Sequence, residues 1–447
     1  MELHNKKIIV IGMGKSGLAA CELLKRMGAR CCAFDENRQM EASVRERFGD
    51  VPVYLGDLPE DVCRELDGAV ISPGIPLTKP AVVMLREKSI PVIGEVELAY
   101  LAEKGTVIGI TGTNGKTTTT SLTGEIMKAY AESVFVVGNI GNPYTKEVEK
   151  TSAGSVTVAE ISSFQLETID TFCPDVSAIL NITPDHLDRH GSMEEYIKAK
   201  FRITENQTEN QLCVLNYEDE VLRDRASGLR CRLAFFSSRR PVKNGLYQNE
   251  NHDIVDGATG EILMNMRDSR IPGDKNCENI MAAILMTREL GVPGDVIVSA
   301  VKAFHAVEHR LEYVCTKNGV EYYNDSKATN PDAAVTGISS MSRRTVLIGG
   351  GYDKSAEYDD WIQAFDGKVK KLILLGDTRE KIAATAERLG FTEYEMADSL
   401  ENAVKRASEI ASPGDAVLLS PACASWDMFD SFEQRGTLFK EYANHLS

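Results

Sequence analysis

The feature that most constrains this chain is a glycine-rich stretch, residues 106–120, with the sequence TVIGITGTNGKTTTT. An apolar, β-branched run ends in two glycines and a Lys-Thr pair, and apolar residues at helical spacing follow between Leu122 and Met127. Gly112 and Gly115 allow the backbone to curl so that its amides point at an anion, and the start of a helix adds positive potential there. The stretch therefore predicts a strand, a phosphate-binding loop and a helix.

The loop is a variant of the G-x-x-x-x-G-K-[ST] pattern, because Ile110 occupies the position of the first glycine. We expect Lys116 to reach the terminal phosphates of a nucleotide and the Thr117 hydroxyl to face Mg²⁺. The alternative is a tight turn with a solvated lysine, which the flanking strand and helix disfavour. The residues expected at the triphosphate are Gly112, Thr113, Asn114, Gly115, Lys116, Thr117 and Thr118.

Length and composition limit the class of protein. The 447 residues suggest about three domains, and an apolar content of 43% supports several cores. Apolar runs are far shorter than a membrane span, and the first residues lead into a strand without a signal peptide, so we expect a cytoplasmic protein. Ten cysteines without a C-x-x-C pair predict reduced thiols. A net charge of −16 without clustered Lys and Arg argues against nucleic acid. We expect a monomer with small-molecule partners and no membrane insertion.

The first unit has the pattern of a dinucleotide-binding fold. Residues 7–11 form an apolar strand, residues 12–17 complete a G-x-G-x-x-G spacing, and a second strand ends at Asp35, where an acid can meet a ribose hydroxyl. Such a loop serves a nicotinamide or flavin cofactor, another nucleotide, or only a turn. The unit ends near Gly94, and its short length favours binding of one nucleotide diphosphate.

Polar residues follow two strands of the central unit. Glu160 ends a buried strand, where a carboxylate needs a partner such as the Mg²⁺ of a nucleotide, with a structural ion pair as the alternative. Residues 185–190 contain two acids, two histidines and an arginine, which are too many for a plain turn. A zinc site there is possible in principle but lacks a cysteine pair. Either histidine alone is more often structural than functional.

The remainder of the central unit carries fewer signals. A helix is predicted over residues 192–206, opening with a capping box of Ser192 and Glu195. Residues 211–270 are strand-rich, and turn sequences at 243–245 and 256–257 predict hairpins. Asn276 and Asn279 lie three apart on one face of the next helix, so both amides could read an adenine edge.

The third unit begins near Phe304 and again alternates strands with helices, including a helix over residues 400–410 and a strand over residues 416–419. A hairpin is expected before Asn324. Polar, glycine-rich segments follow the predicted strands at 349–354 and 420–429, which is where parallel sheets bind their ligands. The pattern along the whole chain is that of an α/β protein.

These features together resemble the Mur ligase family of ATP-dependent peptidoglycan ligases. The resemblance runs through all three units and is carried by Gly112, Gly115, Lys116, Thr117, Glu160, His186, Asn276, Asn279, Arg310 and residues 324–331. Residues 324–330 and 420–425 resemble the members that add D-glutamate to UDP-N-acetylmuramoyl-L-alanine. Folylpolyglutamate synthetases share the ATP loop but lack the first unit. They remain an alternative, as do an NAD-dependent oxidoreductase and a non-catalytic nucleotide sensor.

The resemblance implies an α/β fold with three domains. Residues 1–94 would be a Rossmann-like domain for the nucleotide sugar, residues 95–303 a central P-loop ATPase-like domain, and residues 304–447 a Rossmann-like domain for the amino acid. It also implies ATP, two Mg²⁺ ions and a carbamylated lysine. The expected reaction is activation of the substrate carboxylate as an acyl phosphate, followed by attack of the D-glutamate amine.

The resemblance also implies roles for individual residues. The catalytic residues would be Lys116, His186 and Lys200. Mg²⁺ would be held by Thr117, Glu160, His186 and the carbamate of Lys200. Adenosine would meet Asn276, Asn279, Arg310 and Asp325. The UDP-sugar would meet Gly14, Lys15, Ser16, Asp35, Glu36, Gly74, Asn139 and Gln165. D-Glutamate would meet Thr329, Lys354, Ser425 and Phe432. In one departure from the family pattern, Lys275 stands where a histidine commonly precedes the two asparagines.

Overall fold

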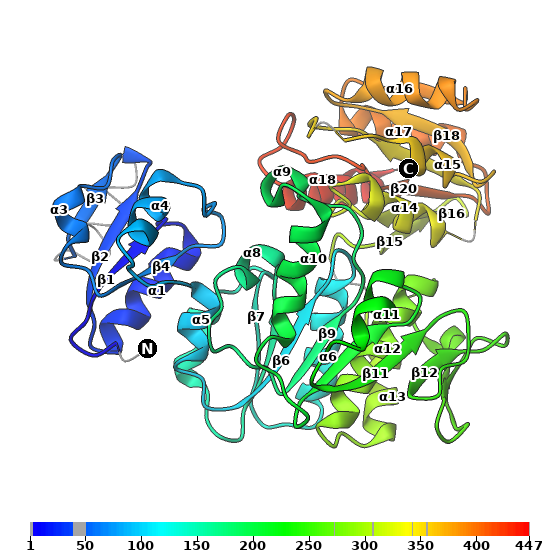
Figure 1. Ribbon diagram of the computed structural model, residues 1–447. Helices are drawn as coiled ribbons and strands as arrows, with labels where there is room; N and C mark the ends of the chain where they lie inside the picture. The colour runs from blue at the N-terminus through cyan, green and yellow to red at the C-terminus, as the bar shows by residue number, and fades with distance from the viewer. Residues whose placement is uncertain are drawn as a thin grey trace. The chain divides into compact units, whose positions relative to one another are not determined.

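The computed structural model describes residues 3–38, 51–271, 273–305, 308–341, 343–354 and 356–446, with the side chain of residue 188 excepted (Figure 1). The chain divides into two compact units. The first consists of Met1–Asn265 with Glu278–Lys302, and the second of Met266–Cys277 with Ala303–Ser447. The division into three domains at residues 94 and 303 stays a prediction.

The first unit opens with a parallel sheet whose strand order is β3-β2-β1-β4-β5. The order reverses at β1, and such a switch point opens a crevice at the carboxyl ends of the strands. The predicted strand over residues 7–11 is confirmed. The elements are β1 (Lys7–Ile11), α1 (Lys15–Arg26), β2 (Arg30–Asp35), β3 (Val53–Leu55), α3 (Glu60–Cys63), β4 (Gly68–Ile71), α4 (Pro80–Glu87) and β5 (Val92–Gly94).

A second sheet in this unit has the order β14-β13-β12-β11-β10-β9-β6-β8-β7. The seven strands β6 to β12 all run parallel to one another, and β13 and β14 extend the sheet beyond β12 as antiparallel strands. Its strands are β6 (Thr106–Thr111), β7 (Val134–Gly138), β8 (Val156–Glu160), β9 (Val176–Ile179), β10 (Leu212–Asn216), β11 (Arg232–Ser237), β12 (Gly245–Gln248), β13 (Asp253–Asp256) and β14 (Ile262–Asn265).

Helices cover this sheet and join it to the first one. Because α1 packs against α5 and α7, and their apolar side chains share one buried cluster, the two sheets form a single compact unit. The helices are α5 (Glu95–Tyr100), α6 (Lys116–Lys128), α7 (Tyr144–Glu147), η2 (Val148–Lys150), α8 (Ser163–Leu166), α9 (Leu187–His190), α10 (Met193–Phe201), η3 (Arg202–Thr204), α11 (Glu220–Ala226), α12 (Asp274–Glu289), whose first residues belong to the second unit, and α13 (Gly294–Ala303).

Two local predictions for the central region need correction. The turn sequence at 243–245 does not close a hairpin, because β11 and β12 run parallel. The pairing itself requires glycine at position 245, since an added Cβ would lie 1.7 Å from the Phe235 carbonyl oxygen. The turn at 256–257 does lead into an antiparallel pair, β13 and β14. The helix predicted over residues 192–206 ends at Phe201 and continues as a short 3₁₀ segment.

The second unit contains a sheet of order β15-β16-β20-β17-β18-β19, in which β15 is antiparallel to β16 and the others run parallel. The helix over residues 400–410, the strand over residues 416–419 and the hairpin before Asn324 are confirmed. Its elements are η4 (Met266–Asp268), β15 (Glu312–Lys317), β16 (Val320–Asn324), α14 (Pro331–Ser339), β17 (Thr345–Gly349), α15 (Asp359–Gln363), β18 (Val369–Leu374), α16 (Arg379–Arg388), β19 (Tyr394–Met396), α17 (Leu400–Ile410), β20 (Ala416–Leu419) and α18 (Phe432–His445).

The α/β fold class predicted from the sequence is confirmed, since each sheet is flanked by helices and most strand pairs are parallel (Figure 1). All ten cysteines carry free thiols, as predicted. Within the described ranges, no helix combines the length and the apolar content needed to cross a membrane.

Candidate active site

The predicted phosphate loop joins β6 to α6, and its shape requires glycine at two positions. Gly112 has φ 149° and Gly115 has φ 83°, which L-residues with side chains rarely adopt. A Cβ added at Gly115 would lie 2.3 Å from the Asn279 side-chain oxygen. The backbone therefore passes close to α12, and the loop enters α6 at Lys116 without a side-chain cap on its first-turn amides.

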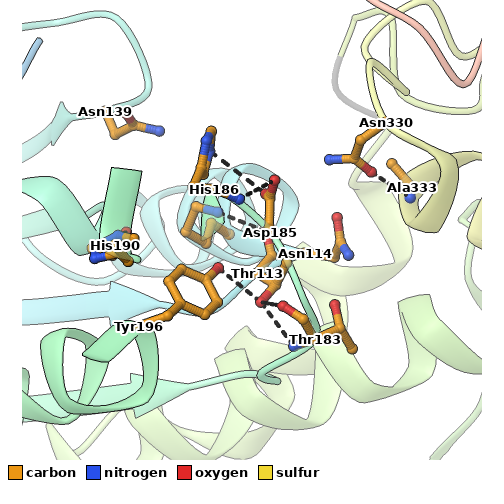
Figure 2. A network of polar contacts seen from close by, with 12 residues as sticks. Thr113, Asn114, Asn139, Thr183, Asp185, His186, His190, Tyr196, Asn330 and Ala333 are labelled. Carbon is orange, nitrogen blue, oxygen red and sulfur yellow. Dashed lines mark hydrogen bonds and ion pairs between the residues drawn. The ribbon is translucent and has the colours of Figure 1, made fainter. Parts of the chain in front are cut away.

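Hydrogen bonds fix this loop to the segment that follows β9 (Figure 2). The Thr113 amide donates to the Asn181 carbonyl oxygen at 2.9 Å, and the Asn114 amide donates to the Asn181 side-chain oxygen at 2.8 Å. The Thr113 hydroxyl lies 3.0 Å from the Tyr196 hydroxyl and also bonds to Thr183. Sequence reasoning missed Tyr196, because an aromatic residue on a helix usually signals only core packing.

Two lysines converge on the carbonyl groups of the loop. Lys116 Nζ donates to the carbonyl oxygens of Gly112 at 2.9 Å and Thr113 at 2.8 Å. Lys200 Nζ donates to the Gly112 carbonyl oxygen at 2.7 Å, although Lys200 is only 2% exposed. Burial, and secondarily the charge of Lys116, holds the pKa of Lys200 well below its usual value. Lys200 is thus a buried amine aimed at the phosphate loop.

Glu160 ends β8 beside this loop, because Glu160 pairs in register with Ile110 of β6. The side chain is 1% exposed, and its Oε1 accepts a hydrogen bond of 2.8 Å from the Asn139 amide group. Its Oε2 is buried and has no hydrogen-bond partner among the described residues. A buried oxygen without a partner raises the free energy of the folded protein unless a cation or a hydrogen-bond donor contacts it. Glu160 is therefore suited to the predicted role of Mg²⁺ ligand.

The two histidines of the loop after β9 differ in environment. His186 has φ 53°, and its side chain is 48% exposed with Nε2 3.6 Å from Asp185 Oδ2 (Figure 2). His190 is buried, with Nε2 2.9 Å from the Ser163 hydroxyl and Nδ1 3.3 Å from Glu167. His190 is therefore structural, whereas the side chain of His186 is half exposed to solvent. Over the described residues, no group of three or more His, Cys, Asp or Glu could hold a metal ion.

A cavity of about 440 Å³ lies between the first glycine loop and the central sheet. Asp35 lies in its wall and accepts hydrogen bonds from the amides of Met13 at 2.7 Å and Asn37 at 2.8 Å. Glu36 does not line this cavity, and its carboxylate pairs with Lys79 at 2.7 Å. The other residues predicted to face the UDP-sugar all line it, namely Gly14, Lys15, Ser16, Asp35, Gly74, Asn139 and Gln165.

In the second unit, Asp325 follows β16 and is buried. Its carboxylate accepts hydrogen bonds from the Ser420 hydroxyl at 2.8 Å and the Leu311 amide at 3.2 Å. Burial raises the pKa of Asp325 to about 7, although the Ser420 hydrogen bond and the Arg310 charge act in the opposite direction. The segment after β16 is thereby tied to the segment after β20.

Arg435 of α18 ties the same two segments together, and sequence reasoning missed it. Its buried guanidinium donates to the Ser326 hydroxyl at 3.0 Å and the Cys423 carbonyl oxygen at 3.1 Å. Burial lowers the pKa of Arg435 to about 10. The only signal was a charged residue on the apolar face of the last helix.

The residues predicted to bind D-glutamate lie in loops that leave neighbouring strands. Asn324 and Ile348 both pair with Leu419, so the loops after β16, β17 and β20 begin side by side. The Tyr352 amide donates to the Ala424 carbonyl oxygen at 3.0 Å, which joins the loop of Lys354 to that of Ser425. Thr329 follows β16, and Phe432 begins α18.

The predicted adenine-reading asparagines both lie on α12. Asn279 is 7% exposed, and its side-chain oxygen accepts a hydrogen bond of 3.1 Å from the Thr119 hydroxyl of α6. The structure therefore places Asn279 directly against the phosphate loop helix. Contact of Asn276, Asn279 and Arg310 with adenosine stays a prediction.

The fold and the phosphate loop define a nucleotide-dependent α/β enzyme, and three family descriptions match successive parts of the chain. The Mur ligase MurD-like N-terminal domain matches residues 6–94, the Mur ligase middle domain residues 110–287, and the Mur ligase glutamate ligase domain residues 309–423. The chain belongs to the Mur ligase family.

Its relatives include proteins named UDP-N-acetylmuramoylalanine–D-glutamate ligase. Those of Lachnospira eligens and Lachnoclostridium phytofermentans are each 52% identical; the alignments cover 100% of this chain and 100% and 99% of theirs. The fold is similar to those of two enzymes from Thermotoga maritima. For UDP-N-acetylmuramate-alanine ligase the TM-score is 0.61 at 18% identity, and the match covers 98% of this chain and 99% of that one. For MurF ligase in complex with ADP the TM-score is 0.60 at 17% identity, and the match covers 99% of this chain and 96% of that one.

Proposed function

We propose that this chain is an ATP-dependent ligase that joins D-glutamate to UDP-N-acetylmuramoyl-L-alanine and releases ADP and phosphate. The observation that carries the proposal is the phosphate loop, with the buried Lys200 amine 2.7 Å from the Gly112 carbonyl oxygen. Beside it, at the end of the adjacent strand, lies a Glu160 oxygen that has no hydrogen-bond partner in the described part of the chain. The names of relatives that are 52% identical over the full chain support the choice of substrates.

The first step is attack of the substrate carboxylate on the γ-phosphate of ATP, which forms an acyl phosphate and releases ADP. The amides of the phosphate loop and Lys116 would offset the charge on the transferred group. Lys116 Nζ donates to two loop carbonyls, which holds the ammonium at the loop where the phosphates would bind. The amine of D-glutamate then attacks the activated carbonyl carbon, and phosphate leaves as the amide forms.

Glu160, Thr117 and His186 are the residues that would hold two Mg²⁺ ions. Bound Mg²⁺ would supply charge neutralisation on the phosphates. The unpartnered, buried Oε2 of Glu160 supports this role, since a hard cation is the partner such an oxygen favours.

We also propose that Lys200 reacts with CO₂ to form a carbamate. The neutral amine is the form that attacks CO₂, and burial beside Lys116 lowers the pKa of Lys200 and so favours that form. The product carries a carboxylate in place of an amine and releases one proton. A negative group there would suit both Lys116 and a metal ion, whereas an ammonium would repel them.

The cavity lined by the first glycine loop would take the nucleotide sugar, with Asn139 and Gln165 toward its muramoyl-alanine end. Lys354, Thr329, Ser425 and Phe432 would take D-glutamate, with Lys354 as the charged partner of a carboxylate. Asn276, Asn279, Arg310 and Asp325 would contact adenosine. We propose that the enzyme acts as a monomer in the cytoplasm, which sedimentation and fractionation would test.

Two alternatives are less well supported. An NAD-dependent oxidoreductase would account for the first glycine loop but not for the phosphate loop or the matches to the Mur ligase middle and glutamate ligase domains. A folylpolyglutamate synthetase-like ligase would not need the first parallel sheet, which matches a MurD-like N-terminal domain.

The test is phosphate release from ATP and Mg²⁺ in the presence of UDP-N-acetylmuramoyl-L-alanine, comparing D-glutamate, L-glutamate and other amino acids. We expect turnover only when the nucleotide sugar and D-glutamate are both present. Turnover with a folate or with NAD and a hydroxy acid, and none with these substrates, would exclude the proposal.

A further inference from the structure

Two exposed aromatic residues lie beside Lys354 in the second unit. Trp426 follows Ser425 and is 63% exposed, and Tyr352 is 40% exposed. Their ring centroids are 5.6 Å apart, with an interplanar angle of 56°. The two rings therefore form an exposed aromatic pair on the surface of this unit.

A cation lies against this aromatic pair. Lys354 Nζ lies 5.1 Å from the centroid of the Trp426 ring, which is within the range of cation–π attraction. Within the described part of the chain, no carboxylate forms an ion pair with Lys354, whereas the neighbouring Asp353 pairs with Lys381 at 3.6 Å. The ammonium therefore keeps its three donors for a ligand while the aromatic ring limits where it can lie.

The backbone that carries the rings is fixed on both sides. Tyr352 is bound through its amide to the Ala424 carbonyl oxygen at 3.0 Å. On the other side, Asp427 Oδ2 accepts a hydrogen bond of 3.0 Å from the Asp377 amide, and a Cβ on Gly376 would lie 2.3 Å from that oxygen. The two loops that carry the aromatic pair are therefore held in place by hydrogen bonds to each other and to the loop of Asp377.

We propose that Trp426, supported by Tyr352, is a positioning residue that holds the Lys354 ammonium in place for a carboxylate of the incoming amino acid. A lysine side chain has many rotamers, and restricting them before the ligand arrives reduces the entropy lost on binding. An aromatic face achieves this without neutralising the charge, which an aspartate or glutamate partner would do. The inference rests on the proposed function.

The kinetic test compares Trp426→Leu with Trp426→Phe. A cation–π contact at an exposed site corresponds to about a two- to five-fold effect, so Trp426→Leu should raise the KM for D-glutamate by that factor. The kcat and the KM for ATP should not change, and Trp426→Phe should recover most of the loss. Tyr313→Leu is the matched control, because Tyr313 is 54% exposed and pairs with Tyr323 at 5.8 Å in the same unit.

A spectroscopic test follows from the tryptophan content. The chain has two tryptophans, and Trp361 is fully buried, so a change of emission on ligand binding would report on Trp426. D-Glutamate, added with the nucleotide sugar and a non-hydrolysable ATP analogue, should shift the emission of the wild type. The shift should disappear in Trp426→Phe, which retains only Trp361, and in Lys354→Ala.

The outcomes separate the inference from the function on which it rests. If the wild type turns over D-glutamate but Trp426→Leu keeps the wild-type KM, only the positioning role is wrong. An equal rise in the KM for ATP, or an emission change that persists in Trp426→Phe, also overturns it. If the wild type itself does not use D-glutamate, the proposed function and the inference fail together.

Discussion

Lys200 Nζ donates a hydrogen bond of 2.7 Å to the carbonyl oxygen of Gly112, which lies 88 residues earlier in the chain. Burial of this amine, and secondarily the charge of the neighbouring Lys116, lowers the pKa of Lys200. Without a functional use, placing two amines at one loop would only destabilise the fold. The contact therefore holds the last turn of α10 against the phosphate loop.

Replacing Lys200 by Ala should abolish phosphate release, because no carbamate can then form. Added bicarbonate should not restore activity, but short carboxylic acids should restore part of it by filling the vacated position. Lys198→Ala is the matched control, since Lys198 lies on the same helix, is exposed and pairs with Glu195 at 2.8 Å. Full activity of Lys200→Ala without any acid would refute the carbamate.

Replacing Lys354 by Ala should raise the KM for D-glutamate, because loss of a charged partner in a closed site costs roughly 2–5 kcal/mol, or about thirty-fold to a few thousand-fold. ATP affinity measured by isothermal titration should change little. Lys368→Ala, which removes a half-buried lysine of the same unit that donates to the Ser339 carbonyl oxygen, should leave both values unchanged. An equal fall in ATP affinity would move Lys354 to the nucleotide site.

Replacing Gly115 by Ala should weaken ATP binding by at least about tenfold, because a φ of 83° costs an L-residue roughly 1–2 kcal/mol and the new Cβ would overlap the Asn279 side chain. The measurement is titration with an ATP analogue, alongside circular dichroism to verify folding. Gly154→Ala is the control, since Gly154 has open space around it and no positive φ. Unchanged nucleotide affinity in Gly115→Ala would mean that the loop does not hold phosphate.

The pKa of Asp325 predicts a pH dependence of stability in the nucleotide-free protein. Its folded-state pKa of about 7 exceeds the ordinary value of 3.8, so the folded state binds the proton more tightly. Stability contributed by this group is therefore present at low pH and lost as the pH rises toward and through 7. Over the whole pH range between the two pKa values, the free energy of unfolding falls by about 4 kcal/mol.

Asp325→Asn remains neutral, so calorimetry between about pH 5 and pH 8 should show the wild type losing stability relative to this variant as the pH rises. Asp415→Asn is the contrasting control. Its hydrogen bond with Lys370 holds the pKa of Asp415 below its usual value, so its contribution should stay constant over this range. Parallel melting curves for Asp325→Asn and the wild type would show that Asp325 is ionised throughout.

Local signals in the sequence predicted much of the fold and the strand, glycine loop and helix at residues 106–128. The glycines at 112 and 115 act through backbone geometry, and the strand ending at Glu160 is marked by continuous apolar residues, so both can be inferred from neighbouring residues alone. The prediction of a hairpin at 243–245 was wrong because neighbouring residues do not determine that connection. Its turn residues are compatible with several connections, and the parallel pairing of Phe235 in the preceding strand with Gly245 cannot be inferred from the turn alone.

Burial of individual polar groups could not be predicted in the same way. Lys198 and Lys200 have similar neighbours in sequence, yet one is exposed and the other is 2% exposed, because the phosphate loop covers only one side of α10. Glu36, predicted to face the nucleotide sugar, instead pairs with Lys79, 43 residues away. Such partners are decided by tertiary packing, which leaves no trace in a local pattern.

The assignment of Met266–Cys277 to the second unit has a consequence for dissecting the protein. A recombinant fragment that starts at Ala303 would omit Arg270, which hydrogen-bonds His305, and Gly273, where an added Cβ would lie 2.9 Å from the Ser340 hydroxyl. Such a fragment would expose surface that these residues cover. A soluble C-terminal piece therefore calls for a circularly permuted or linker-fused gene in which residues 266–277 are joined to the remainder of that unit.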